Sequence, residues 1–154
     1  MKNTPLWLAV GCQRKEMVKL LLRHHADASD RNTSQPFGDG RTPVMIAVHG
    51  PEHEKRPDPE ILQLLIDHGA DVDAIDGAGR SALVIAVGGN SLACVRRLLD
   101  AGASLEVHNG DWSLRNLAQW RGFTQIGEML EEELRNRGEK LSMICHSTFP
   151  DQYI

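Results

Sequence analysis

The side chains best suited to metal binding or nucleophilic catalysis are seven histidines and three cysteines. His49 and His53 are four residues apart, but Pro51 lies between them and no cysteine or carboxylate pattern completes a tetrahedral set. Cys145 stands beside His146, yet adjacency in sequence does not place a thiol against an imidazole in catalytic geometry. The spacing therefore predicts surface histidines and no metal site.

The cysteines Cys12, Cys94 and Cys145 are odd in number and match no metal ribbon or Cys-x-x-Cys motif. Cys94 falls on the apolar side of an expected helix, which favours a packing role, and Cys12 falls near an expected turn. These features predict reduced thiols in a cytoplasmic protein.

Glycines cluster at 38–40 and at 77–79. Neither cluster follows a strand and opens a helix, so neither resembles a phosphate-binding loop, and both are typical of turns. With no catalytic constellation in view, we predict a non-catalytic protein that needs no cofactor. A metal-dependent enzyme is the alternative, which stoichiometric zinc or turnover in a hydrolase screen would support.

Length and composition predict one soluble domain. The chain has 154 residues, 41% of them hydrophobic but only 5% aromatic, so the core must be built from aliphatic side chains. The net charge of -4 gives no sign of the basic face that nucleic acids require. No segment approaches the roughly 20 apolar residues that span a bilayer, and the apolar stretch near the N-terminus is too short for a signal peptide. We expect a monomer with no nucleic-acid or membrane partner.

One short segment recurs along the chain. It reads TPLWLAV at 4–10, TPVMIAV at 42–48, SALVIAV at 81–87 and, in degraded form, SLRNLAQ at 113–119. A second segment follows the first three copies and reads MVKLLLRHHADA at 17–28, ILQLLIDHGADV at 61–72 and CVRRLLDAGASL at 94–105. Recurrence at a fixed spacing is the signature of a repeat architecture.

Both segments predict helices. A leading Thr or Ser can cap a helix by accepting a backbone N–H bond, and Pro5 and Pro43 stand where a missing N–H costs nothing. The second segment predicts a longer amphipathic helix that stops at Gly69 or Gly102, the residue type that most easily adopts the left-handed conformation. His25 replaces that glycine in the first copy, although histidine tolerates the conformation less readily.

The Thr-Pro-Leu start, the central Ala, the Leu-Leu run and the Gly-Ala-Asp end together resemble the ankyrin repeat over roughly residues 3–138. The resemblance implies an all-α fold: an ankyrin-repeat solenoid of about four stacked helix-turn-helix units with short hairpin turns. It divides a single domain, 1–138, into repeats at about 1–36, 37–75, 76–107 and 108–138.

Four departures from the pattern could carry specificity. The first repeat lacks its leading hairpin, and the last one has a second helix that is polar on one face, as a terminal repeat requires. The second repeat contains a charged, proline-rich insertion at 49–60, which is either a functional loop or a tolerated insertion. The tail at 139–154 is rich in apolar residues and either packs on the last repeat or docks on a partner.

The resemblance also implies a concave binding surface made of the hairpin tips and the exposed faces of the first helices. The matching residues that we expect to contact a partner protein are Asp39, Arg41, His49, Arg80, Trp112, Trp120 and Arg121. Trp and Arg are enriched in binding hot spots. The alternatives are that the two tryptophans are packing residues and that Arg41 and Arg80 are solvated turn residues.

The function predicted is therefore a non-catalytic module for binding proteins. A narrower version is an immunity or inhibitor protein that neutralises one toxin or enzyme. Another is an adaptor or regulatory fragment of a longer protein. Because a fold alone does not specify a function, these versions stay open at the level of the sequence.

Overall fold

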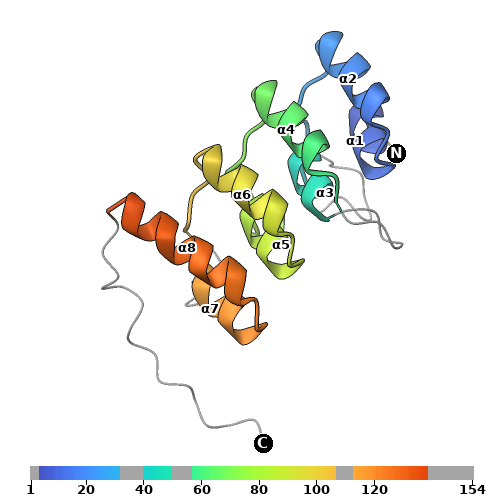
Figure 1. Ribbon diagram of the computed structural model, residues 1–154. Coiled ribbons are helices and arrows are strands. Elements are labelled where there is room, and N and C mark those ends of the chain that lie inside the picture. The colour runs from blue at the N-terminus through green and yellow to red at the C-terminus, as the bar shows by residue number, and fades with distance from the viewer. Residues whose placement is uncertain (1–3, 32–39, 50–56, 107–112, 139–154) are drawn as a thin grey trace, which may run out of the picture.

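The structure is a computed structural model that describes residues 4–31, 40–49, 57–106 and 113–138. Within them the chain forms helices joined by short turns (Figure 1). The helices are α1 (Pro5–Gly11), α2 (Lys15–Arg23), α3 (Pro43–His49), α4 (Pro59–Asp67), α5 (Ala82–Gly88), α6 (Leu92–Asp100), α7 (Leu114–Trp120) and α8 (Thr124–Asn136). The predicted all-α fold class is confirmed. The 139–154 tail, Asp39, Trp112 and most of the 49–60 insertion lie outside the described residues.

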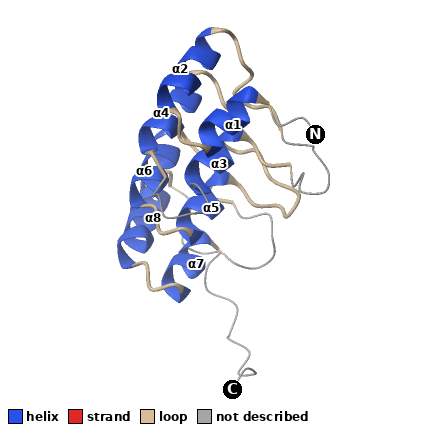
Figure 2. Cartoon of the chain, turned by 90° about the vertical axis from the view of Figure 1, so that its right-hand side faces the viewer, coloured by secondary structure: helices blue, strands red, loops and turns tan. Residues whose placement is uncertain are grey.

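The helices pair as α1/α2, α3/α4, α5/α6 and α7/α8, which we call the first to fourth repeats. Each helix packs on its partner and on the corresponding helix of the neighbouring described repeat or repeats. As a result α1, α3, α5 and α7 form one layer, and α2, α4, α6 and α8 form a second layer (Figure 2). Each repeat contributes one short and one longer helix, and the apolar sides that face a neighbouring described repeat are covered by it.

The predicted Thr and Ser caps form in three of the four first helices. The hydroxyl oxygens of Thr4, Ser81 and Ser113 accept backbone N–H bonds three residues ahead, at 3.3, 3.4 and 3.2 Å. Thr42 is the exception, because its hydroxyl is buried and has no hydrogen-bond partner among the described residues. The capping prediction is therefore wrong at Thr42 and confirmed at the other three positions.

The predicted left-handed stops are also present. His25, Gly69 and Gly102 have φ angles of 61, 78 and 82°. The residue that follows each stop donates its N–H to the helix carbonyl five residues back, at 3.0, 3.0 and 2.9 Å. The same geometry thus ends α2, α4 and α6 and turns the chain toward the next hairpin. His25 confirms that histidine can occupy the glycine position of this turn.

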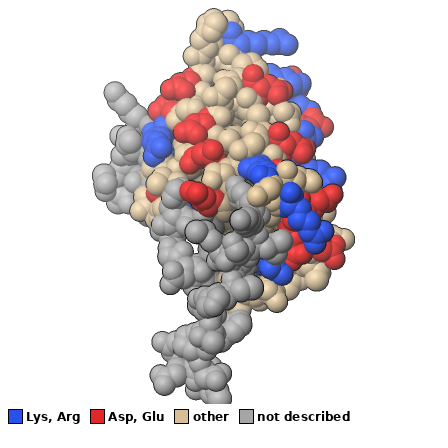
Figure 3. Space-filling model, turned by 90° about the vertical axis from the view of Figure 1, so that its left-hand side faces the viewer, with Lys and Arg blue, Asp and Glu red and all other residues tan. Residues whose placement is uncertain are grey.

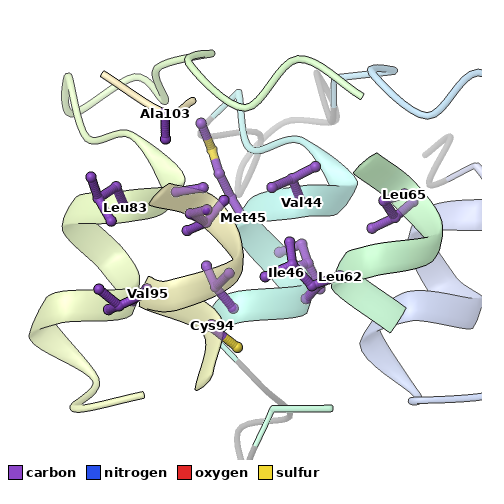
Figure 4. Close-up of a cluster of buried hydrophobic side chains, with 14 of the residues drawn as sticks. Val44, Met45, Ile46, Leu62, Leu65, Leu83, Cys94, Val95 and Ala103 are labelled. Atoms are coloured by element: carbon purple, nitrogen blue, oxygen red, sulfur yellow. The ribbon is translucent and has the colours of Figure 1, made fainter. Parts of the chain in front are cut away.

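The core is aliphatic, as the low aromatic content predicts. Six consecutive residues of α3, from Pro43 to Val48, are buried. Figure 4 shows Val44, Met45 and Ile46 of this helix between Leu62 and Leu65 of α4 and the side chains of α5 and α6.

Cys94 belongs to this core, with 0% of its surface exposed. Burial raises the pKa of its thiol, more than the nearby Ser91 and Arg97 lower it. The thiol therefore stays protonated near neutral pH, and the predicted packing role of Cys94 is confirmed.

Candidate functional site

The hairpin before α5 is built around a buried carboxylate. The Asp76 side chain has no exposed surface. One carboxylate oxygen accepts the backbone N–H groups of Ala78 and Arg80, each at 2.9 Å. The other oxygen accepts Nε and Nη2 of the Arg80 guanidinium, at 2.9 and 2.8 Å. Asp76 therefore fixes both the backbone of the turn and the direction of the Arg80 side chain.

These contacts also set the protonation of Asp76. Burial by itself raises the pKa of the carboxyl group, but the Arg80 N–H, the Arg80 guanidinium and the Ala78 N–H together outweigh it, so the pKa is lowered. The carboxylate is thus held in its charged form, which is the form that binds Arg80.

A second hairpin lies against the first. Arg41 Nε is 3.9 Å from the same Asp76 oxygen that binds Arg80. A Cβ placed on Gly40 would lie 3.6 Å from the backbone nitrogen of Gly77. Arg41 and Arg80, which the sequence places 39 residues apart, therefore meet at one buried carboxylate. They are not simply solvated turn residues, because both have this internal contact.

Sequence reasoning did not identify Asp76 as the centre of this group. The available signal was an aspartate directly before turn glycines, since Asp side chains hydrogen-bond the backbone two residues ahead. That signal predicts the bond to Ala78, but it does not predict the approach of Arg41 from another repeat.

Neighbouring repeats are linked by side-chain bonds near their hairpins. Ser29 Oγ accepts the N–H of Asp71 at 2.9 Å, and Asp73 Oδ1 accepts the N–H of Ser104 at 2.7 Å. The two bonds occupy equivalent positions in successive repeats. They fix the spacing of the hairpins, so the surface near the hairpins is held in place by its own contacts.

The opposite ends of the first helices form a second group of equivalent positions. They are Gly11, His49, Gly88 and Trp120, the last residues of α1, α3, α5 and α7. Trp120 is 66% exposed, and the Arg121 guanidinium lies 5.4 Å from the centre of its ring. This exposure argues against the alternative that Trp120 is a packing residue. A cation over an aromatic face is a favourable contact that holds both side chains at the surface.

Among the last residues of the first helices, Gly88 has open space around it for a side chain. A Cβ placed there would have no atom within 4 Å, so the surface is open beside α5. His49, at the equivalent position of α3, is exposed as predicted. We call Arg41, Asp76 and Arg80 the hairpin group. This group and the last residues of the first helices lie at opposite ends of seven-residue helices, about 10 Å apart. The predicted contact residues thus form two groups on one layer of helices.

Charge is mixed on the surface that Figure 3 shows, where both acidic and basic side chains are present. Among the described residues, no group of three or more His, Cys, Asp or Glu side chains is arranged to hold a metal ion. None of the described helices is long and apolar enough to cross a membrane. Whether the protein is free of catalytic activity stays a prediction.

Comparison with known proteins agrees with this architecture. A family model of ankyrin repeats, in three copies, matches residues 1–76 and 53–133. The chain is 31% identical to ankyrin repeat and SOCS box protein 6 of Homo sapiens over 87% of its length, and it spans 32% of that protein. It is 33% identical to neurogenic locus notch homolog protein 1 of Mus musculus over 71% of its length, and spans 4% of that protein.

A third relative, the B-cell lymphoma 3 protein homolog of Mus musculus, is 30% identical over 97% of the chain, which spans 39% of that protein. The relatives are thus much longer than the region they share with this chain. The matched residues include the recurring segments, the caps and the left-handed stops that build the two helix layers. From the family match and the fold together, the chain belongs to the ankyrin repeat family.

Proposed function

We propose that this protein binds a partner protein through the hairpins and first helices, on the surface that carries Arg41, His49, Arg80, Trp120 and Arg121. Ankyrin repeats are generally protein-interaction modules, which supports the general class of function. The observation that carries the proposal here is the exposed Trp120 with Arg121 over its ring. Tryptophan and arginine are enriched among the residues whose truncation weakens protein interfaces most.

The hairpin group supports the same proposal in a different way. Arg80 is 40% exposed although its guanidinium binds Asp76, so part of the side chain stays available at the surface. Because its orientation is already fixed, less side-chain entropy is lost when a partner binds it. Arg80→Ala would, however, also remove the two guanidinium hydrogen bonds to Asp76, at 2.9 and 2.8 Å, so it would lower stability as well as affinity.

A sharper test adds a side chain where the structure has space. Gly88→Arg places a large group on the proposed surface without a steric clash, since nothing lies within 4 Å of a new Cβ there. Gly127→Arg is the matched control: it has equally open space but lies on α8, in the other helix layer. Both changes should leave the circular dichroism spectrum native, because neither glycine has a positive φ.

The partner is first found by affinity capture from the source cell with mass spectrometry of the retained proteins. We expect one protein to be retained by the original chain and by Gly127→Arg but lost with Gly88→Arg. Trp120→Ala should weaken its binding about 30-fold, the effect of a hot-spot residue. Equal retention by all variants would show that this surface is not the binding site.

The narrower inhibitor or immunity role would be supported if the captured protein is a toxin or enzyme whose activity falls when the chain is added. Our proposal also includes a monomeric state and a cytoplasmic location. The location is supported by the unpaired thiols of Cys12 and Cys94 and is tested by cell fractionation.

A further inference from the structure

The first repeat exposes apolar side chains that the other repeats bury. Leu8 of α1 is 48% exposed, whereas Ile46, at the same position of α3, is 8% exposed. Met17 of α2 is 50% exposed, whereas its equivalents Ile61 and Cys94 are 1% and 0% exposed. Equivalent positions in the repeat thus differ because α1 and α2 cover α3 and α4, while no described helix packs on the outer side of α1 and α2 (Figure 1).

A third residue extends this surface. Leu20 is 49% exposed, and it lies on the same side of α2 as Met17 because residues three apart are neighbours on a helix. We call Leu8, Met17 and Leu20 the end face. It is the surface of the first repeat that corresponds to an internal junction between repeats, so its shape is suited to packing against a helix.

The charges beside the end face indicate what kind of helix it can bind. Arg14, Met17, Leu20 and Arg23 follow one another at intervals of three, so an arginine stands at each end of the apolar pair. Both arginines are exposed. From Arg14 to Arg23 the chain has four basic residues and a single acidic one, Glu16, although the whole chain has a net charge of -4. Lys15 and Lys19 pair with Glu60 and Glu16 and line a groove with α4, so the positive charge beside the end face comes from Arg14 and Arg23.

This charge pattern argues against a second copy of the chain as the occupant. Two end faces packed antiparallel about a two-fold axis would bring Arg14 of one copy toward Arg23 of the other. Like charges facing each other across an interface are unfavourable. A helix with carboxylates at the same places would pair with both arginines instead.

We propose that the end face binds an amphipathic α-helix of a partner protein whose apolar stripe has Asp or Glu at both ends. Apolar residues of that helix would cover Leu8, Met17 and Leu20, and its carboxylates would pair with Arg14 and Arg23. Binding of an amphipathic helix by its apolar face is a common mode of recognition. This second surface is separate from the hairpin and first-helix surface, so the inference does not depend on the proposed function.

The test uses two synthetic helical peptides of about 18 residues, long enough for five turns. Both have the same leucine stripe, with glutamates at its ends in one peptide and lysines in the other. Fluorescence anisotropy with the full chain should show binding of the glutamate peptide that is at least about tenfold tighter than that of the lysine peptide. The double variant Arg14→Glu/Arg23→Glu should reverse this preference, an outcome that a purely hydrophobic contact would not give.

Met17→Glu should weaken binding of the glutamate peptide by about tenfold or more. The control is Ile75→Glu, which alters an equally apolar residue, 36% exposed, on a hairpin away from the end face. It should leave peptide binding unchanged, and so should Gly88→Arg, which separates this inference from the proposed function. Thermal unfolding checks that each variant is folded.

The proposal is overturned if neither peptide binds, or if both bind equally well to the original chain. It is also overturned if sedimentation shows a dimer that Met17→Glu dissociates, because the end face would then bind a second copy.

Discussion

The outer surfaces of the first and fourth repeats differ in polarity. At the first repeat, Leu8, Met17 and Leu20 are each about half exposed. At the fourth repeat, the large exposed hydrophobic residue of the described chain is Trp120 of α7, and none lies on α8. That helix instead has ion pairs, with Glu131 2.8 Å from Arg115 and Glu133 2.7 Å from Arg137.

Arg137 links the fourth repeat to the third. Its guanidinium donates to the carbonyl oxygens of Ala103 and Leu99, at 2.8 and 3.2 Å, and so satisfies the end of α6 in the preceding repeat. The fourth repeat thus has charged groups on its surface and supplies hydrogen-bond donors to the third repeat. The difference teaches that the two outermost repeats of the described chain present different outer surfaces: α8 has polar contacts, whereas α1 and α2 have an apolar face.

The largest expected effect is a loss of stability in the core, which we compare with the same change at the end face. Leu98 is fully buried, so Leu98→Ala should lower the free energy of unfolding by about 2–5 kcal/mol. Leu20→Ala makes the same chemical change at the end face and should change it by less than about 0.5 kcal/mol. Urea denaturation measures both. A large loss for Leu20→Ala would show that the end face is already covered in the isolated chain.

The next effect compares two carboxyl groups whose pKa is lowered: Glu16 on the exposed side of α2 and Asp76 inside a hairpin. At Glu16 the cause is chiefly the hydrogen bond from Lys19, on a fully exposed side chain, whereas Asp76 is bound inside a hairpin. A lowered folded-state pKa gives stability that is present above the unfolded value and is lost on acidification, so stability should fall below about pH 4.

Asp76→Asn should lower the free energy of unfolding by about 1.5–3 kcal/mol at neutral pH and reduce its loss in acid. Glu16→Gln should leave the acid dependence nearly unchanged. Thermal unfolding from pH 2 to 7 checks both variants. An acid dependence that persists in Asp76→Asn and disappears in Glu16→Gln would reverse the assignment.

A third prediction tests the contacts between Arg137 and the end of α6. Arg137→Ala should cost about 1–2 kcal/mol of stability, because it leaves the carbonyl groups at the end of α6 without their charged donor. Arg135→Ala is the control, since this arginine is 70% exposed and 4.0 Å from Glu131; its removal should cost less than about 0.5 kcal/mol. Equal losses in chemical denaturation would mean that the contacts to α6 add nothing.

The smallest effects distinguish two equivalent hydroxyl groups. Ser81→Ala removes a helix cap and should cost about 1 kcal/mol. Thr42→Val replaces a buried hydroxyl that has no partner among the described residues, so stability should be unchanged or slightly higher. Melting temperatures of the two variants provide the measurement, and a clear loss for Thr42→Val would indicate a hydrogen bond to its hydroxyl in solution.

Much of the fold could be predicted from the sequence because the repeat is defined by local chemistry. Hydroxyl caps, prolines at the first helical position and glycines at the stops act within a few residues of where they stand. That is why the starts of α1 and α5 and the left-handed residues Gly69 and Gly102 follow from the sequence. The candidate contact residues of the surface could be identified only through the family resemblance.

What the sequence determined by itself is therefore the repeating helix pair and its turns. What only the tertiary structure decided is which equivalent residues differ: Met17 is exposed where Ile61 is buried, and Arg41 and Arg80 converge on Asp76. The physical reason is that local propensity acts within one segment, whereas burial and ion pairing depend on what the neighbouring repeat brings into contact.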